Sequence, residues 1–358
     1  MSHSTLSHQS TVFKTQLSQY LYFIRGVAIA FVVIGHVIGY NIAYGMRQIY
    51  NSDLSFLGWI CDLINTFHMP TFFIASGIAF TAFSNKNISY KKFFTSKFQK
   101  LLIPLIVWCP PYFILQSLSK AKPFSVTDVI TAVIFPYEIF WFLHVLIFTT
   151  LFAFLYFKNF KSIIGYSLLS VGLFIASTLL NNPEIQKYFF WNLFYIFGVL
   201  ITGYLPKLET FMAKNGHVFT NIVIPGLCLA MMVICEYFLP KDARIDYLRM
   251  INGIVGFILL YFISMQLINR VEKQANNNLL HKFIQCCQYL GAVSIAIYLF
   301  HGYFTGFSKA ILLKFLGLPH PSLYFVVVSF MGITGPLLMY EILKSRSKPF
   351  LFSIGAAK

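Results

Sequence analysis

The chain has 358 residues, of which 58% are hydrophobic and 11% are charged, and its mean hydropathy is +0.71. Soluble domains carry about 25% charged residues, so this composition excludes an ordinary soluble enzyme and predicts a polytopic membrane protein. The formal net charge is +16, yet no motif or aromatic-interleaved basic groove typical of nucleic-acid binding accompanies it. We therefore expect no nucleic-acid partner. The six cysteines show no metal-ligand spacing and are interpreted as reduced packing residues.

Apolar runs of the length that a hydrocarbon core of about 30 Å demands recur along the whole chain. They predict an all-α protein with about ten transmembrane helices, at residues 20–40, 60–83, 100–119, 139–157, 162–180, 188–205, 218–238, 249–269, 290–313 and 323–343. A partly apolar segment between Pro123 and Pro136 is interpreted as a re-entrant or interfacial helix. No internal repeat of the kind found in many transporters is visible.

The distribution of cationic residues over this map predicts the orientation. If the N-terminus is cytoplasmic, the inside segments hold seventeen lysines and arginines and the outside segments hold eight. The positive-inside rule therefore places both termini in the cytoplasm. The predicted organisation is a cytoplasmic segment at 1–19, a transmembrane domain at 20–343 and a basic cytoplasmic tail at 344–358. The first apolar run is too long for a signal-peptide core, so we expect an uncleaved anchor.

Two ionisable residues, Arg25 and His36, lie inside the first apolar run. An arginine near a helix centre costs about 2.5 to 3.5 kcal/mol on insertion scales, so such residues indicate a polar cavity. Eleven residues at about 100° each make three turns, which puts both side chains on one helical face about 16 Å apart. In the predicted orientation Arg25 lies nearer the cytoplasm. Arg25 is then placed to hold the anionic head of a donor, and His36 to act as a base, nucleophile or proton relay. The alternative is that Arg25 reaches the head groups and His36 bonds a neighbouring helix.

Three further histidines, His68, His144 and His301, fall in apolar runs. With His36 they can line one polar cavity in the outer half of the membrane. A zinc site is not expected, because no acidic or cysteine ligand accompanies them at ligand spacing. Each alone is more often a hydrogen-bonded helix-contact residue, and His144 is the weakest candidate. The few acids near the external span ends are left unassigned as partners of His36: Glu138, Asp62 and Glu236.

The Arg25, ten residues, His36 pattern resembles the first span of the acyltransferase 3 family of membrane proteins. Four later segments resemble the family in the same order, namely FHMPTFFIASG (67–77), KFQKLLIP (97–104), WFL (141–143) and SIAIYLFH (294–301). The resemblance therefore covers most of the chain.

This resemblance implies an integral-membrane O-acyltransferase of the bacterial inner membrane. It implies transfer of an acetyl or other short acyl group from cytoplasmic acyl-CoA, most simply acetyl-CoA, to a hydroxyl of an envelope or surface glycan such as lipopolysaccharide O-antigen or exopolysaccharide. No metal is implied, and the partners are acyl-CoA, the carbohydrate and membrane lipids. His36 and Arg25 take the positions of the family's catalytic residues. Lys97 and Lys100 stand where relatives commonly have two arginines, so the charge is kept but the bidentate fork is lost. Positive-inside anchoring is the other interpretation of this lysine pair.

For the acceptor, we expect contributions from His68, Trp141, Tyr298 and His301, although core packing is the commoner role of buried aromatic residues. Two other functional classes stay open. One is a proton-coupled transporter or flippase for a glycan precursor, which intramembrane histidines would also serve. The other is a non-catalytic membrane scaffold, which leaves the family motifs without a purpose.

Overall fold

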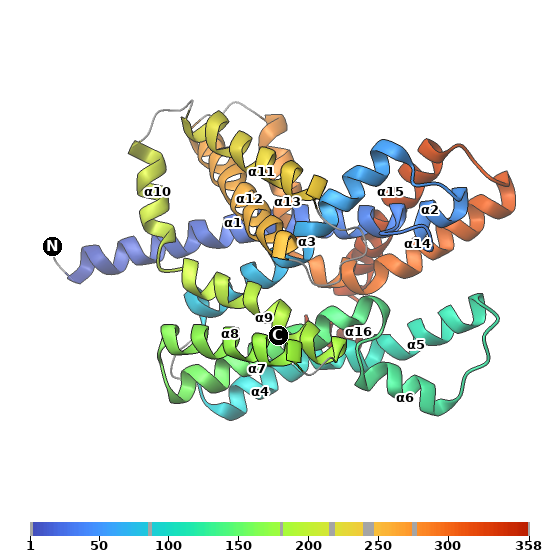
Figure 1. Cartoon of the computed structure of the whole chain (residues 1–358), viewed down its shortest axis with the longest axis horizontal. Coiled ribbons are helices and arrows are strands. Elements are labelled where there is room, and N and C mark those ends of the chain that lie inside the picture. Colours follow the sequence, from blue (N-terminus) through green and yellow to red (C-terminus); the bar gives the residue numbers. More distant parts are fainter. Residues whose placement is uncertain are drawn as a thin grey trace. The chain divides into compact units, whose positions relative to one another are not determined.

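The computed structural model describes residues 3–84, 88–179, 182–214, 219–238, 247–273 and 278–356. In these residues every regular element is a helix, as the apolar runs predicted (Figure 1). Among the described residues, seven helical segments are long and apolar enough to cross a membrane, or up to nine if each of two broken pairs is one span. The chain is therefore an all-α polytopic membrane protein. Four of the cationic residues used to predict the orientation lie outside the described residues: Lys86, Lys241, Arg244 and Lys358.

Most candidate spans in the described residues follow the predicted runs, but they number seven to nine rather than about ten, and the span Val126–Asn159 begins well before the run predicted at 139–157. The seven are Val12–Ile38, Ser55–Phe83, Tyr90–Ser119, Val126–Asn159, Phe219–Phe238, Arg249–Val271 and Pro321–Lys344. The two broken pairs are Glu184–Ile201 with Leu205–Phe211, and Leu279–Ala292 with Ser294–Leu316. The run predicted at 162–180 forms the shorter apolar helix Ile163–Leu179. The run predicted at 290–313 differs, because the helix is interrupted between Ala292 and Ser294.

The chain divides into two compact units, each with its own packing. Unit 1 comprises Met1–Ser84 and Ser162–Ser294. Its helices are α1 (His3–Ile38), α2 (Gly45–Tyr50), α3 (Ser55–Phe83), α8 (Ile163–Leu179), α9 (Pro183–Ile201), α10 (Leu205–Lys214), η3 (Phe219–Val223), α11 (Ile224–Phe238), α12 (Tyr247–Lys273) and α13 (Asn278–Ala292). Helix α3 packs against α1, α9 and α12, and α1 also packs along α13.

Glycines allow the backbones of unit 1 to approach one another. A Cβ on Gly26 of α1 would overlap the carbonyl of Cys287 in α13, and a Cβ on Gly291 of α13 would overlap the backbone of α1. The same reciprocal arrangement joins α3 and α9 at Gly77 and Gly198. Small residues at such crossings are typical of membrane helices, where close van der Waals contact replaces the hydrophobic effect as the driving force. The Gly26 contact fixes α1 one residue away from Arg25.

Unit 2 comprises Asn85–Lys161 and Ile295–Lys358. Its helices are α4 (Tyr90–Lys97), η1 (Phe98–Leu102), α5 (Ile103–Ser119), α6 (Val126–Ile134), η2 (Glu138–Phe140), α7 (Trp141–Asn159), α14 (Ser294–Leu316), α15 (Pro321–Lys344) and α16 (Lys348–Ser353). Helix α5 packs against α6 and α16. An edge-to-face contact of Trp108 with Phe300, with ring centroids 4.5 Å apart, joins α5 to α14.

In two segments the structure shows helix boundaries that the hydropathy pattern does not predict. Helix α1 starts at His3, well before the apolar run, in a segment that holds no proline or glycine before Gly26. The segment between Pro123 and Pro136 forms the nine-residue helix α6, which packs on α5. Its start is fixed by a capping box of Ser125 and Asp128.

Candidate active site

Helix α1 carries the two ionisable residues that the sequence singles out. Arg25 is partly buried, and His36 is exposed in the last turn of the helix. Ile29 and Val32 share their face by helical geometry, and these two side chains are 0% and 1% exposed. The helix therefore presents Arg25 and His36 at two separate levels with apolar packing between them.

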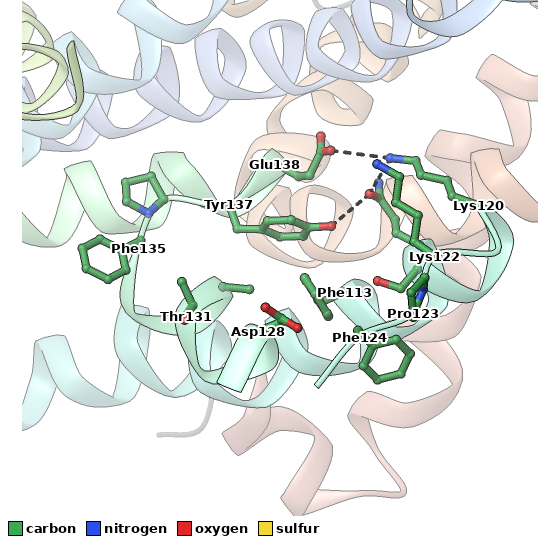
Figure 2. A pocket seen from close by; sticks show the side chains of 14 residues that line it. Phe113, Lys120, Lys122, Pro123, Phe124, Asp128, Thr131, Phe135, Tyr137 and Glu138 are labelled. Carbon is green, nitrogen blue, oxygen red and sulfur yellow. Dashed lines mark hydrogen bonds and ion pairs between the residues drawn. The ribbon is translucent and has the colours of Figure 1, made fainter. Parts of the chain in front are cut away.

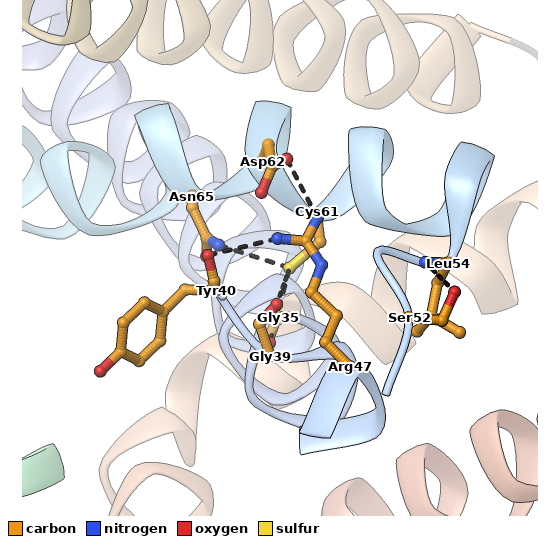
Figure 3. Close-up of polar contacts among 9 residues, drawn as sticks. All are labelled: Gly35, Gly39, Tyr40, Arg47, Ser52, Leu54, Cys61, Asp62 and Asn65. Atoms are coloured by element: carbon orange, nitrogen blue, oxygen red, sulfur yellow. Dashed lines mark hydrogen bonds and ion pairs between the residues drawn. The ribbon is translucent and has the colours of Figure 1, made fainter. Parts of the chain in front are cut away.

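The last turn of α1 is anchored to α3. The thiol of Cys61 lies 3.6 Å from the carbonyl oxygen of Gly35 and 3.5 Å from that of Gly39, and Asn65 Nδ2 donates to the Cys61 sulfur at 3.3 Å (Figure 3). Gly39 ends the helix with a φ of +94°, a conformation that favours glycine. Because His36 lies between Gly35 and Gly39, these contacts fix the turn that carries it.

A buried ion pair closes the loop that follows. Arg47 of α2 is 5% exposed, and its Nη2 donates to Asp62 Oδ2 of α3 at 3.0 Å (Figure 3). Its Nη1 donates to the carbonyl oxygen of Tyr40 at 3.3 Å. Burial lowers the pKa of Arg47, but the hydrogen bond and charge of Asp62 outweigh burial and raise it above its ordinary value. Gly58 leaves the room for the guanidinium, since a Cβ there would lie 2.6 Å from Nη2.

This Arg47–Asp62 pair was not predicted from the sequence. Asp62 was noted as an acid near an external span end, but the structure shows that its carboxylate binds Arg47. The available signal was an arginine in a short loop next to an apolar run that contains an aspartate. Glu138, a second acid left unassigned, lies 3.8 Å from Lys120.

His68 lies buried on α3, one residue from an aromatic contact between α3 and α1. Its Nδ1 is 2.8 Å from the carbonyl oxygen of Ile64. Because a carbonyl only accepts hydrogen bonds, Nδ1 carries a proton, and Nε2 is the acceptor when the ring is neutral. The neighbouring Phe67 packs edge-on against Phe31 of α1, with ring centroids 5.7 Å apart. His68 and His36 thus belong to two helices that pack directly against each other.

The expected aromatic and histidine residues of unit 2 gather in one cluster. The Tyr298 hydroxyl donates to the Ile139 carbonyl, and its ring lies 5.3 Å from that of Phe142, the neighbour of Trp141. His301 is 1% exposed, and its Nδ1 lies 2.8 Å from the Tyr298 carbonyl oxygen. Tyr298 and His301 are therefore held in the core of unit 2, whereas Trp141 is only partly buried.

His144, the weakest of the predicted candidates, lies within hydrogen-bond distance of two backbone carbonyl oxygens. Its Nδ1 lies 3.0 Å from the carbonyl oxygen of Phe140, and its Nε2 lies 2.8 Å from that of Val133. The contact with Val133 ties α7 to α6. Across the residues that the structure describes, no group of three or more His, Cys, Asp or Glu side chains is placed to hold a metal ion.

Lys97 and Lys100 lie at a π-helical turn that leads into α5. Lys97 Nζ is 5.6 Å from the centroid of the Phe93 ring, and Lys100 is exposed within the turn. π-Helical turns are rare and occur frequently at functional sites. The C-terminal segment contacts the backbone of the turn, since a Cβ on Gly355 would lie 2.7 Å from the Lys100 Cα. The two lysines belong to unit 2, whereas Arg25, His36 and His68 belong to unit 1.

These helices and their ionisable groups define a polytopic membrane protein with polar sites inside its membrane-spanning segments. The acyltransferase 3 family, described as an acyltransferase domain, matches residues 18–341, nearly the whole chain. The chain belongs to this family, and it is a membrane acyltransferase. No curated protein and no solved structure matches this chain.

Proposed function

We propose that this protein is an O-acetyltransferase of the bacterial inner membrane that modifies an envelope or surface glycan. The donor is cytoplasmic acetyl-CoA, and the acceptor is a sugar hydroxyl of a polymer such as lipopolysaccharide O-antigen or exopolysaccharide. The observation that carries the proposal is the family match over residues 18–341, which includes Arg25 and His36. The exposure of His36 in a turn anchored from Gly35 and Gly39 supports it, because a catalytic group must be both accessible and fixed.

The donor would be held by cationic side chains. Coenzyme A carries phosphate groups, and Lys100 is exposed in the turn that leads into α5. Lys97 and Lys100 would act as point charges on these phosphates, in place of the bidentate arginine contact. Arg25 would bind an oxygen of the donor inside the membrane, where a guanidinium gains most from an anionic partner.

His36 would manage the proton of the reaction. As the sugar hydroxyl oxygen attacks the thioester carbonyl carbon, the His36 imidazole takes the hydroxyl proton. The C–S bond then breaks, and the leaving thiolate of coenzyme A receives that proton from the imidazolium. The products are the sugar acetyl ester and free coenzyme A, and the His36 imidazole is neutral again at the end of the reaction.

A two-step route uses the same residue as a nucleophile. An imidazole nitrogen of His36 attacks the thioester carbon, the C–S bond breaks, and the coenzyme A thiolate leaves with the ring proton. The sugar hydroxyl oxygen then takes the acetyl group from the ring, and the hydroxyl proton returns to the imidazole. Initial-rate kinetics distinguish the routes, because the two-step route gives parallel double-reciprocal lines and releases coenzyme A without acceptor. The direct route gives intersecting lines and requires both substrates before release.

The proposal is tested with purified protein in lipid nanodiscs, isotope-labelled acetyl-CoA and a panel of purified bacterial polysaccharides. Label appearing on a polysaccharide with the wild type, and lost in Arg25→Ala and His36→Ala, supports acetyl transfer. Solute flux that depends on His36 in a protein inert toward every donor and glycan would instead identify a transporter.

A further inference from the structure

Unit 2 contains a cavity of about 470 Å³ that the proposed mechanism does not use (Figure 2). It lies between the end of α5, helix α6 and the segment that leads into α7, and all of its lining residues lie between 113 and 138. Sites that bury most of a small molecule have volumes of about 300 to 1,000 Å³. In the predicted orientation α5 runs outward from its basic start, so that this cavity opens near the external surface.

Aromatic rings form one part of the wall. Phe113 contacts two other rings of this wall, with its ring centroid 5.9 Å from that of Phe124 and 5.2 Å from that of Tyr137. Phe124 is 39% exposed although it is a large apolar side chain in a short loop. An exposed ring beside a cavity offers a flat apolar surface to a ligand that carries apolar C–H groups.

A set of hydrogen-bonded polar side chains forms another part of the cavity wall. Gln116 Oε1 accepts from the Tyr137 hydroxyl at 3.1 Å and from Lys120 Nζ at 3.2 Å, and Lys120 lies 3.8 Å from Glu138 (Figure 2). These contacts hold a donor and acceptor array in place before any ligand arrives, which lowers the entropic cost of binding.

The charges of the lining are balanced. Lys120 and Lys122 contribute two positive charges, and Asp128 and Glu138 contribute two negative charges. An anionic ligand would gain from the lysines and lose to the carboxylates. A neutral ligand rich in hydroxyl groups uses both sets, because each hydroxyl donates one hydrogen bond and accepts others.

We propose that this cavity binds one neutral pyranose unit of the acceptor glycan. The sugar ring places its C–H face against Phe124, and its hydroxyls bond the charged and amide groups of the lining. The identification of the ligand as the acceptor rests on the proposed function, whereas binding of the sugar itself does not. The cavity would thus hold the glycan chain while another of its sugars is acetylated.

Binding is measured directly by saturation-transfer NMR on the whole protein in nanodiscs. Maltoside detergents are avoided, because their head group is itself a pyranose. The probes are methyl glycosides of glucose, galactose, mannose and rhamnose, with methyl glucuronide as the anionic comparison. The variants are Phe124→Ala, which removes the exposed ring, and Lys122→Gln, which removes a charged donor. The controls are Val126→Ala, which is 76% exposed outside the cavity, and Lys314→Gln, an exposed lysine of α14.

We expect at least one neutral glycoside to bind with a Kd on the order of 1 mM. Phe124→Ala should weaken binding about fivefold or more, and Lys122→Gln about threefold, with both controls within about twofold of the wild type. The proposal is overturned if no neutral glycoside binds, if only the glucuronide binds, or if both cavity variants bind like the controls.

Acetyl transfer is assayed on the same preparations to separate the two proposals. Glycoside binding with the expected variant effects, in a protein that transfers no acetyl group, would support the sugar site and contradict the proposed function. Acetyl transfer by a protein that binds none of the neutral glycosides would support the proposed function and overturn the sugar site.

Discussion

The Arg47–Asp62 ion pair gives the sharpest test of how the His36 turn is held in place. We consider Asp62→Ala, which removes the carboxylate and leaves the guanidinium in position. The side chains of Arg47 and Asp62 are 6% and 24% exposed, so that the pair is buried mainly on the arginine side. Losing one partner of a fully buried pair costs about 3 to 5 kcal/mol, because the remaining charge stays unpaired. With Asp62 partly in contact with solvent, we expect the free energy of unfolding to fall by about 2 to 3 kcal/mol.

The assay is reversible unfolding in mixed micelles titrated with a denaturing detergent, followed by tryptophan fluorescence. The matched control is Glu184→Ala, which breaks the exposed Glu184–Lys187 pair, whose nitrogen and oxygen are 2.9 Å apart. That change should cost less than about 1 kcal/mol. The double variant Arg47→Met with Asp62→Leu should recover at least half of the loss, because it leaves no charge unpaired.

The same change should slow acyl transfer. Asp62→Ala loosens the loop from α1 to α3, and we expect kcat to fall about tenfold or more while the KM for the donor changes little. An Asp62→Ala protein as stable and as active as Glu184→Ala would refute the reasoning. A double variant less stable than Asp62→Ala would also refute it, since the cost would then arise from lost packing rather than from an unpaired charge.

Three further predictions use the same preparations. Gly26→Ala should lower the free energy of unfolding by about 1 to 3 kcal/mol, because the new Cβ overlaps the α13 backbone, whereas Gly172→Ala, with open space around it, should not destabilise. The double variant Lys97→Gln with Lys100→Gln should raise the KM for acetyl-CoA about tenfold at unchanged kcat. The double variant Lys97→Arg with Lys100→Arg, which keeps both charges, should have a KM close to that of the wild type. An unchanged KM in the glutamine variant would remove both lysines from the donor site. Tyr298→Phe should cost about 1 kcal/mol of stability, because its hydroxyl bonds Ile139, and an unaltered acceptor KM would contradict the predicted contribution of Tyr298 to the acceptor site.

The hydropathy pattern was sufficient to predict the positions of most of the helices. The runs at 60–83 and 323–343 match Ser55–Phe83 and Pro321–Lys344 within a few residues, because the length of an apolar run reflects the thickness of the membrane. The hydropathy pattern could not show that α1 begins at His3, since polar residues can continue a helix without any hydropathy signal. Hydropathy also did not predict the interruption after Ala292, because the apolar run continues through it.

The sequence predicted the arrangement of candidate site residues only where they lie on one helix and their spacing sets which face they share. The shared face of Arg25 and His36 follows from their spacing, but the burial of Ile29 and Val32 between them depends on neighbouring helices. The Arg47–Asp62 pair joins residues fifteen positions apart through a turn whose shape the sequence does not specify. The roles of Arg25 and His36 in catalysis stay predictions of the family resemblance.

The most direct test is acetyl transfer in proteoliposomes supplied with acetyl-CoA on the side of the Lys97 and Lys100 turn and with glycan on the other side. Mass spectrometry of the glycan reports the product for the wild type, His36→Gln and the control His281→Gln, an exposed histidine on α13. We predict that the wild type and the control add acetyl groups at similar rates. His36→Gln should be slower by about 100-fold or more, the contribution of a positioned general base. Transfer by His36→Gln at the wild-type rate would contradict a catalytic role for His36.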